Sequence, residues 1–332
     1  MTSPERRFTP VVRLAPAKLN LTLAVVGRRP DGYHALHSVM VPLGLADRLS
    51  VAVLAKPDAP DSLHVIGFDA GSPADNLALR AIAAARDAVR RARGEAPPLA
   101  VRLEKRIPVA AGLAGGSSDA AAALDAAIEA WGADVEPWAR REIAVGLGSD
   151  VLFFLDGGAA LIEGRGERVT SLHGVKASGD ASEAPGVLLV TPAVPAHTAA
   201  VFEAWSGGAM GEPGTVRRTS EHFASEFGSG LTVRALIERA GVLASANDLL
   251  PAAAAVVPGL VPLRRALARL LNRPIGLSGS GPTLWALYPS LDDAEEAASA
   301  VRSAIASDTL PTPGDGSPFV AATTIQATRR EE

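Results

Sequence analysis

The chain of 332 residues contains no cysteine. Disulfides, thiolate nucleophiles and cysteine-ligated zinc are therefore excluded, and the lack of cysteine fits a reducing cytoplasm. Aromatic residues make up only 4% of the chain, so an aromatic side chain in a polar turn stands out. No apolar run approaches the roughly 18 residues that a membrane-spanning helix needs. We therefore expect a cytoplasmic protein with no membrane partner.

An excess of basic residues is also missing. The chain has 32 Lys and Arg against 36 Asp and Glu, with a net charge of −4, which argues against a nucleic-acid partner. Its length exceeds one typical core, so we expect two lobes, 1–175 and 176–332, joined through the linker-like stretch 170–186. The oligomeric state is expected to be a monomer or a weak homodimer.

Strand-like and helix-like segments are segregated within each half, which indicates an α+β fold rather than a doubly wound sheet. Alternating or apolar patterns predict strands at 11–14, 19–26, 38–43, 49–54, 99–104, 187–190 and 320–328, and a strand–glycine–strand element at 275–288. Helical periodicity predicts helices at 76–93, about 117–131, 138–145, 198–205, 232–240, 259–271 and 291–305. The apolar run 151–155 is predicted to be a buried strand, and 206–230 and 307–318 to be mobile segments.

Residues 107–124 read IPVAAGLAGGSSDAAAAL, a glycine-rich turn before an alanine-rich helix. Glycine lets the backbone approach a ligand closely, and the free amides at a helix N-terminus attract anions, so the segment predicts a phosphate cradle. An ordinary flexible turn with a helix cap would explain it equally well. The segment has neither the Gly-Lys-Ser/Thr of a Walker A loop nor G-x-G-x-x-G spacing.

Three segments read together resolve this choice. APAKLNLTLAVVGRRPDGYHAL at 15–36, the glycine-rich segment, and GLSGSGPTLWALY at 276–288 resemble, in order, the three signature motifs of the GHMP small-molecule kinases. The resemblance implies a two-lobed fold, with an N-terminal ribosomal-protein-S5-domain-2-like lobe and a C-terminal GHMP kinase α/β-sandwich lobe. The first segment is most similar to members that phosphorylate the 2-hydroxyl of a cytidine-diphosphate-linked methylerythritol in non-mevalonate isoprenoid synthesis.

Other interpretations stay open at this point. A GHMP kinase of the homoserine or mevalonate type would share the three motifs, and so would an ATP-binding sensor of the same fold without turnover. A purely structural interaction module would leave the three glycine clusters unexplained.

Phosphoryl transfer to an alcohol needs a positioned hydroxyl, a proton acceptor and charge that offsets the γ-phosphate. The resemblance places the family's catalytic lysine and aspartate on Lys18 and Asp150. By themselves, a lysine in a strand is usually solvated, and an aspartate there can simply cap a turn. The segment GSDVLFF has Leu152 where the family usually carries proline, which leaves the aspartate in place.

ATP is the expected phosphoryl donor, with its phosphates over 112–118. The resemblance assigns it to Pro108, Val109, Ala110, Ala111, Gly112, Leu113, Ala114, Gly115, Gly116, Ser117 and Ser118. Asn76 and Lys105 match positions near the nucleotide, although a helix cap and a solvated strand end would also explain them. Mg²⁺ is expected to bridge the β- and γ-phosphates, with Ser118 as its candidate protein ligand.

The stretch Asp31-Gly-Tyr-His34 matches the family's DGYH and implies a cytidine pocket. Tyr33 would stack on the pyrimidine and His34 would bond its edge, while Asn20 would bind the methylerythritol. Phe202 is a candidate for the opposite stacking face, or a core aromatic on its helix. The third glycine cluster, 276–281, is expected to shape the site or to form a tight turn.

Overall fold

The computed structural model describes residues 9–56, 58–176, 184–207 and 214–326. Parts of the predicted linker 170–186, of the segment 206–230 and of the strand 320–328 therefore lie outside the described residues. The chain packs into two compact units. The first comprises Met1–Pro16, Ala46–Ile107 and Gly115–Leu155, and the second comprises Ala17–Leu45, Pro108–Ala114 and Asp156–Glu332. The predicted lobes 1–175 and 176–332 stay a prediction.

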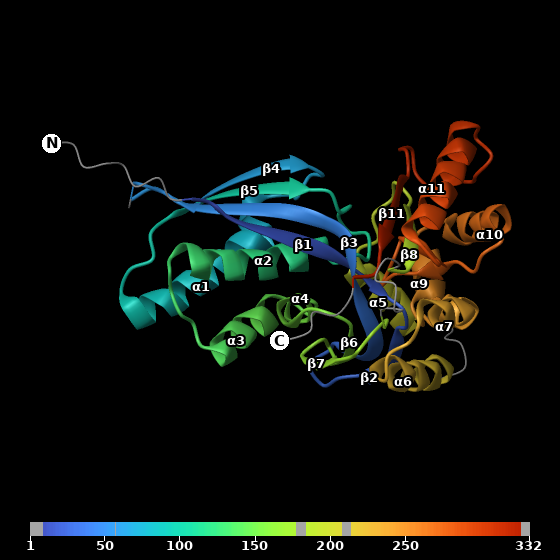
Figure 1. The fold of residues 1–332 in the computed structure, drawn as a ribbon, viewed down its shortest axis with the longest axis horizontal. Helices are drawn as coiled ribbons and strands as arrows, with labels where there is room; N and C mark the ends of the chain where they lie inside the picture. Colours follow the sequence, from blue (N-terminus) through green and yellow to red (C-terminus); the bar gives the residue numbers. More distant parts are fainter. Residues whose placement is uncertain (1–8, 57, 177–183, 208–213, 327–332) are drawn as a thin grey trace. The chain divides into compact units, whose positions relative to one another are not determined.

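The first unit is built on strand β5 (Leu99–Lys105), which pairs antiparallel with the second half of β3 (His34–Val53) and parallel with β4 (Ser62–Gly67). Helices α1 (Leu77–Arg93) and α2 (Gly115–Ala130) pack against each other below these strands (Figure 1). The short η1 (Pro73–Asp75) precedes α1, and α3 (Pro137–Leu147) and α4 (Val151–Asp156) follow α2.

Helix α1 forms because its apolar residues recur on one face. These buried residues are Ala78, Ala81, Ile82, Ala85 and Val89. Helix α2 is apolar nearly all round because it is rich in alanine, and it is buried along most of its length. Its small side chains allow close packing on α1, which places the start of α2 directly beside the end of β5.

The second unit contains the first half of β3, which pairs antiparallel with β2 (Ala24–Arg28) and β6 (Ala160–Gly164); β6 also pairs with β7 (Arg168–Ser171). Strand β1 (Val11–Asn20) pairs with β3 as well. A separate antiparallel sheet has the order β11 (Phe319–Thr324), β8 (Gly186–Thr191), β10 (Leu284–Tyr288) and β9 (Gly276–Leu277).

Helices cover this second sheet. Helix α11 (Leu291–Ala306) packs against β8 and β11, and α5 (Thr198–Gly207) packs against α9 (Leu250–Val256) (Figure 1). Between them in the chain lie α6 (Thr215–Gly228), α7 (Val233–Glu238) and α8 (Ala240–Leu243), and α10 (Leu260–Leu271) follows α9. The core includes Leu188, Val190, Leu263, Leu284 and Val301, all almost fully buried.

The structure confirms the α+β class and corrects four local predictions. Strand β1 is continuous over Val11–Asn20, where separate strands were predicted at 11–14 and 19–26. The run 151–155 forms helix α4 instead of a strand, since five apolar residues cannot distinguish the two. The segment predicted to be mobile at 206–230 contains α6, which buries Phe223 and Phe227 one turn apart. Strand β3 is continuous where two strands were predicted.

Within the described residues, no single helix is both long and apolar enough to cross a membrane, while one bent pair, α9 with α10, passes on length and composition alone.

Candidate active site

Lys18, near the end of β1 in the second unit, is 3% exposed. Its ammonium donates to Asn20 Oδ1 at 2.5 Å and to the Gly112 carbonyl at 2.7 Å, and its amide donates to the Leu113 carbonyl at 3.1 Å. A Cβ atom on Gly279 would lie only 2.9 Å from Lys18 Nζ, so the third glycine cluster also borders this ammonium. Lys18 is therefore held in one orientation, which excludes an ordinary solvated lysine.

A chain of hydrogen bonds runs from the Asn20 side-chain nitrogen to His37. Asn20 Nδ2 donates to Ser38 Oγ at 2.8 Å, and Ser38 Oγ donates to the Thr22 carbonyl at 2.5 Å. The Thr22 hydroxyl lies 2.7 Å from Ser220 Oγ, which lies 2.8 Å from His37 Nδ1. This arrangement fixes the amide of Asn20, so that its oxygen faces Lys18.

Burial of His37 lowers the pKa of its imidazole, and Arg217 adds to this effect against the opposing Glu163 and Glu221. His37 therefore takes part in the chain as a neutral ring near pH 7.

The glycine-rich segment 108–114, also in the second unit, turns its carbonyl groups into the protein. The carbonyls of Ala110, Ala111 and Leu113 accept from the amides of Ala196, Thr283 and Lys18, respectively. The Gly112 carbonyl accepts from Lys18 Nζ and, at 3.0 Å, from Ser278 Oγ. Within the described part of the chain, the amides of 110–114 donate no hydrogen bond to protein. Ala111 and Leu113 are buried, whereas Ala110, Gly112 and Ala114 are partly exposed, so the amides of these three are the candidates for binding an anion.

The conformation of this segment depends on close packing. Gly112 has a φ of 76°, and a Cβ atom there would collide with the carbonyl oxygen of Ser278. Ala110 and Ala114 also lie in the left-handed region, at φ of 52° and 55°. Alanine is disfavoured in this region, so the surrounding hydrogen bonds must hold the backbone in place.

Helix α2 begins at Gly115 in the first unit, where its first amides are without intrahelical acceptors. Ser118 Oγ and Asp119 Oδ1 are both buried and, among the described residues, form no hydrogen bond. Two unpartnered buried oxygens at a helix N-terminus mark a place where a ligand or ion would satisfy them. Gly116 is exposed and Ser117 is half-buried, so the start of the helix is accessible.

Lys105, the last residue of β5, is 4% exposed and is not a solvated strand end. Its ammonium bonds to Asp47 Oδ2, and it donates to Asp119 Oδ2 at 2.7 Å. Asp47 also accepts from the amides of Arg106 and Ile107, at 2.5 and 2.8 Å. The sequence analysis missed this triad, Asp47–Lys105–Asp119, because its members lie on three separate elements.

Burial raises the pKa of the Asp119 carboxyl to about 7; Lys105 opposes this rise, while the nearby Asp47 carboxylate adds to it. The triad lies beneath the start of α2, because a Cβ atom on Gly115 would lie 3.1 Å from Lys105 Nζ. Lys105 therefore supports the start of the helix from inside the first unit, and its contact with a nucleotide stays a prediction.

Asn76 acts as the N-cap of α1. Its side-chain oxygen accepts from the Ala78 amide at 3.0 Å, and the residue is 8% exposed. The helix-cap interpretation of Asn76 is thus correct, and a role near the nucleotide stays a prediction.

Asp150 directly precedes α4 in the first unit and is partly exposed. Lys18 belongs to the second unit, so their pairing in catalysis stays a prediction.

The candidate cytidine residues gather in the second unit. The His34 ring stacks on Phe202 at 5.0 Å with an interplanar angle of 18°, and Trp205 meets it edge-on at 5.2 Å. His34 Nε2 lies 3.0 Å from Ser206 Oγ. Burial, followed by the charge of Arg28, lowers the pKa of His34, so its ring is neutral near pH 7. Trp205 is an addition that the sequence analysis did not identify.

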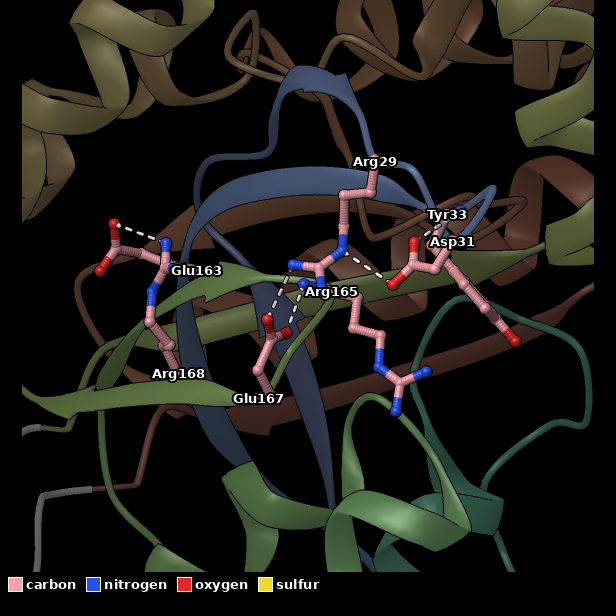
Figure 2. Close-up of polar contacts among 7 residues, drawn as sticks. All are labelled: Arg29, Asp31, Tyr33, Glu163, Arg165, Glu167 and Arg168. Atoms are coloured by element: carbon pink, nitrogen blue, oxygen red, sulfur yellow. Dashed lines mark hydrogen bonds and ion pairs between the residues drawn. The ribbon is translucent and has the colours of Figure 1, made fainter.

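Tyr33 is 55% exposed, and the Arg165 guanidinium lies over its ring at 5.3 Å from the centroid. Figure 2 shows Arg29 between two carboxylates, donating to Asp31 at 3.0 Å and to Glu167 at 2.9 Å. Burial disfavours ionisation of Asp31, but the Tyr33 amide, Arg29 and Arg165 together lower its pKa below the ordinary value. The turns that carry Tyr33 and Arg165 are therefore joined by ionised groups.

Asn247 anchors the third glycine cluster. Its side-chain nitrogen donates to the carbonyls of Leu277 and Gly279, at 2.9 and 3.0 Å. The neighbouring Asp248 accepts from the Val25 amide at 2.9 Å. The cluster is thereby fixed next to Lys18 and Gly112, and it serves both as a tight turn and as a wall of the lysine site.

Comparison with known proteins identifies the family. Residues 76–158 match the GHMP kinases N terminal domain, and residues 229–307 match the GHMP kinases C terminal domain. The chain is 36% identical, over 88% of its length and 94% of the relative's, to a 4-diphosphocytidyl-2-C-methyl-D-erythritol kinase of Pelotomaculum thermopropionicum. It is also 34% identical to the corresponding kinase of Mesorhizobium japonicum, over 87% of this chain and 90% of the relative.

Solved structures agree with these relatives. A crystal structure of 4-(cytidine 5'-diphospho)-2C-methyl-D-erythritol kinase is similar with a TM-score of 0.65 and 33% identity, over 95% of this chain and 99% of that one. A homoserine kinase from Cytophaga hutchinsonii shares the fold, with a TM-score of 0.63 and 16% identity. The match covers 98% of this chain and 97% of that one. The chain therefore belongs to the 4-diphosphocytidyl-2-C-methyl-D-erythritol kinase family of the GHMP kinases.

Proposed function

We propose that this protein transfers the γ-phosphoryl group of ATP to the 2-hydroxyl of 4-diphosphocytidyl-2-C-methyl-D-erythritol, giving the 2-phosphate and ADP in non-mevalonate isoprenoid synthesis. The observation that carries the reaction class is the segment 110–114, whose carbonyls bind protein while its amides have no protein acceptor among the described residues. The choice of acceptor is supported by relatives of this name along most of the chain. The site assignments below belong to the same proposal.

ATP binds with its phosphates on the amides of the glycine-rich segment and at the start of α2. Amides and the helix dipole together favour a polyanion without requiring a mobile side chain. Asn76, as the cap of α1, and Lys105, beneath Gly115, keep the elements around the nucleotide in place.

Asp150 accepts the proton of the 2-hydroxyl as the hydroxyl oxygen attacks the γ-phosphorus. Lys18 offsets the negative charge that builds up on the transferred phosphoryl group. The neutral oxygens of Asn20 and Gly112 orient this ammonium without cancelling its charge. The bond between the γ-phosphorus and the β,γ-bridging oxygen breaks, and its electron pair stays on ADP, the leaving group. The γ-phosphoryl group is then bonded to the acceptor oxygen.

Mg²⁺ fits the chemistry at the start of α2. Ser118 Oγ and Asp119 Oδ1 are buried oxygens without a partner among the described residues, and oxygen is the ligand that Mg²⁺ prefers. No group of three or more His, Asp or Glu side chains in the described residues can hold a metal by itself. Ser118 would therefore hold the ion, which would offset the charge of the phosphates.

The acceptor binds with its cytosine at Tyr33, His34 and Phe202, and with its methylerythritol near Asn20. The neutral His34 has one donor and one acceptor nitrogen for the edge of a base. His34 and Phe202 stack on each other in the structure, so a base would bind beside them on Tyr33 or separate them.

Purified full-length protein tests the function. ADP release should require the cytidine-linked alcohol, and ³¹P NMR should locate the new phosphate on the 2-hydroxyl. ADP release with homoserine or mevalonate, but not with this alcohol, would overturn the substrate assignment. ATP binding without ADP release with any of the three would instead support a sensor.

A further inference from the structure

The turn between β2 and β3 and the turn between β6 and β7 are linked in the second unit into one platform, which comprises Arg29, Asp31 and Glu167. Arg29 bonds the carboxylates of both turns, Asp31 in the first and Glu167 in the second (Figure 2). The same carboxylates also fix the backbone, since Asp31 accepts from the Tyr33 amide at 3.1 Å and Glu167 from the Arg165 amide at 2.6 Å. The platform thus places Tyr33 and Arg165 next to each other.

Three arginines in this region have different contacts. Arg29 is saturated by two carboxylates, and Arg168 pairs with Glu163 at 3.5 Å. Among the described residues, the Arg165 guanidinium forms no ion pair or side-chain hydrogen bond, and its contact is the face of the Tyr33 ring. Arg165 is also only partly exposed, so its position is determined by the platform and the ring.

The cation–π contact leaves the hydrogen-bonding capacity of Arg165 unused. The contact involves the charge of the guanidinium over the Tyr33 ring, whereas its five N–H donors have no acceptor among the described residues. Paired N–H groups match two oxygens of a phosphate, and the ring beneath removes part of the competing water. Tyr33, more than half exposed, adds a surface on which a base can stack. A planar cation beside an open aromatic ring is suited to a nucleoside diphosphate.

We propose that Arg165 binds the diphosphate of the acceptor substrate while Tyr33 carries the cytosine. This inference rests on the proposed function, and it adds a residue that the family resemblance does not supply. Arg165 is thereby a specificity-determining residue: it favours a diphosphate-linked alcohol over an alcohol without phosphate. The glycine-rich segment, by contrast, serves the phosphates of ATP.

The direct test compares ligands with and without the diphosphate. In titration calorimetry, Arg165→Met should weaken binding of CDP by about tenfold or more and change binding of cytidine by less than about twofold. In steady-state kinetics, the same variant should raise the KM of the cytidine-linked substrate by about tenfold, with the KM of ATP unchanged. Arg165→Lys should recover part of the CDP affinity, since it restores the charge but not the planar fork.

Arg168→Met is the matched control, because it removes a neighbouring arginine whose partner is Glu163. It should leave CDP binding unchanged. Equal weakening of CDP and cytidine by Arg165→Met would show that Arg165 only orients Tyr33 and would overturn the inference. Unchanged CDP binding by a variant with normal melting would overturn it as well. If wild type and Arg165→Met turn over the substrate with the same kinetics, the role of Arg165 is rejected and the proposed function stands. If wild type neither binds CDP nor turns over the substrate, the proposed function is rejected as well.

Discussion

Lys18 and Lys105 are two buried lysines with different hydrogen-bond acceptors. Lys18 is held by an amide oxygen and a backbone carbonyl, whereas Lys105 lies between the carboxylates of Asp47 and Asp119. Carboxylates neutralise an ammonium within the protein, while neutral oxygens only orient it. The two lysines thus share their burial but differ in these contacts, and the roles proposed for them, catalytic for Lys18 and structural for Lys105, differ in the same way.

The largest expected effect follows from removing Lys105. Lys105→Met leaves the Asp47 and Asp119 carboxyls buried without their cation and should lower the free energy of unfolding by about 3–5 kcal/mol. Urea unfolding measures this loss. The exposed Lys56→Met is the matched control and should unfold like wild type. The double variant Lys105→Met/Asp119→Asn should regain part of the loss, and equal stability of Lys105→Met and wild type would contradict the structural role.

Lys18→Met should show the opposite pattern. We expect kcat to fall at least about a hundredfold, because charge on the transferred phosphoryl group is no longer offset. The free energy of unfolding should fall by about 1–3 kcal/mol, since the Asn20 side-chain oxygen and the Gly112 carbonyl lose a donor. Paired measurements of turnover and urea unfolding test this contrast. If Lys18→Met lost more stability than Lys105→Met and retained turnover, the catalytic role of Lys18 and the structural role of Lys105 would have to be exchanged.

Asp150→Asn sharpens the catalytic side of the comparison. The substitution removes the proton acceptor but keeps the size of the side chain, so turnover should fall at least about a hundredfold while ATP still binds. Single-turnover kinetics and ATP titration measure the two properties separately. Near-normal turnover would remove Asp150 from its proposed role.

The pH dependence of the free energy of unfolding tests the ionisation of Asp119 in the Asp47–Lys105–Asp119 triad. Because burial raises the pKa of Asp119 from 3.8 to about 7, the folded protein binds one more proton than the unfolded chain between these values. This contribution to stability is fully present below about pH 4 and is lost as the pH rises through about 7. Asp119→Asn should abolish that part of the pH dependence in urea unfolding. The same pH profile in both proteins would show that Asp119 ionises normally.

The smallest effect concerns the support of Lys18. Ser38→Ala removes the acceptor of the Asn20 side-chain nitrogen and should lower kcat by about three- to tenfold, with the KM of ATP unchanged. Ser38→Thr keeps the hydroxyl and should restore kcat. Ser50→Ala, on the same strand, is the control and should have no effect. A loss that Ser38→Thr fails to restore would point to packing instead of the hydrogen bond.

The sequence predicts best where the signal is local. Helix α1, its cap at Asn76 and the helix after the glycine-rich turn follow from residues within one or two turns of each other. The strand predicted at 151–155 was wrong, because five apolar residues suit a strand and a helix equally, and the segment forms α4. The sequence did not reveal α6, because the glycine- and proline-rich residues before it suggested a mobile segment.

Contacts between distant residues required the structure. Asp47 reaches Lys105 from another strand, and Arg165 reaches Tyr33 from another hairpin, so no spacing in the sequence connects them. The motifs located Lys18 by resemblance, but its neutral partners became visible only through the fold.

The inward-facing carbonyls of the glycine-rich segment have a consequence for protein design. Their donors come from Lys18, Ala196, Ser278 and Thr283, all remote in the chain. A short peptide with this motif, or a graft of it onto a foreign scaffold, would lack those anchors and should not keep this backbone conformation. Transplanting the cradle therefore requires its surroundings to be moved with it.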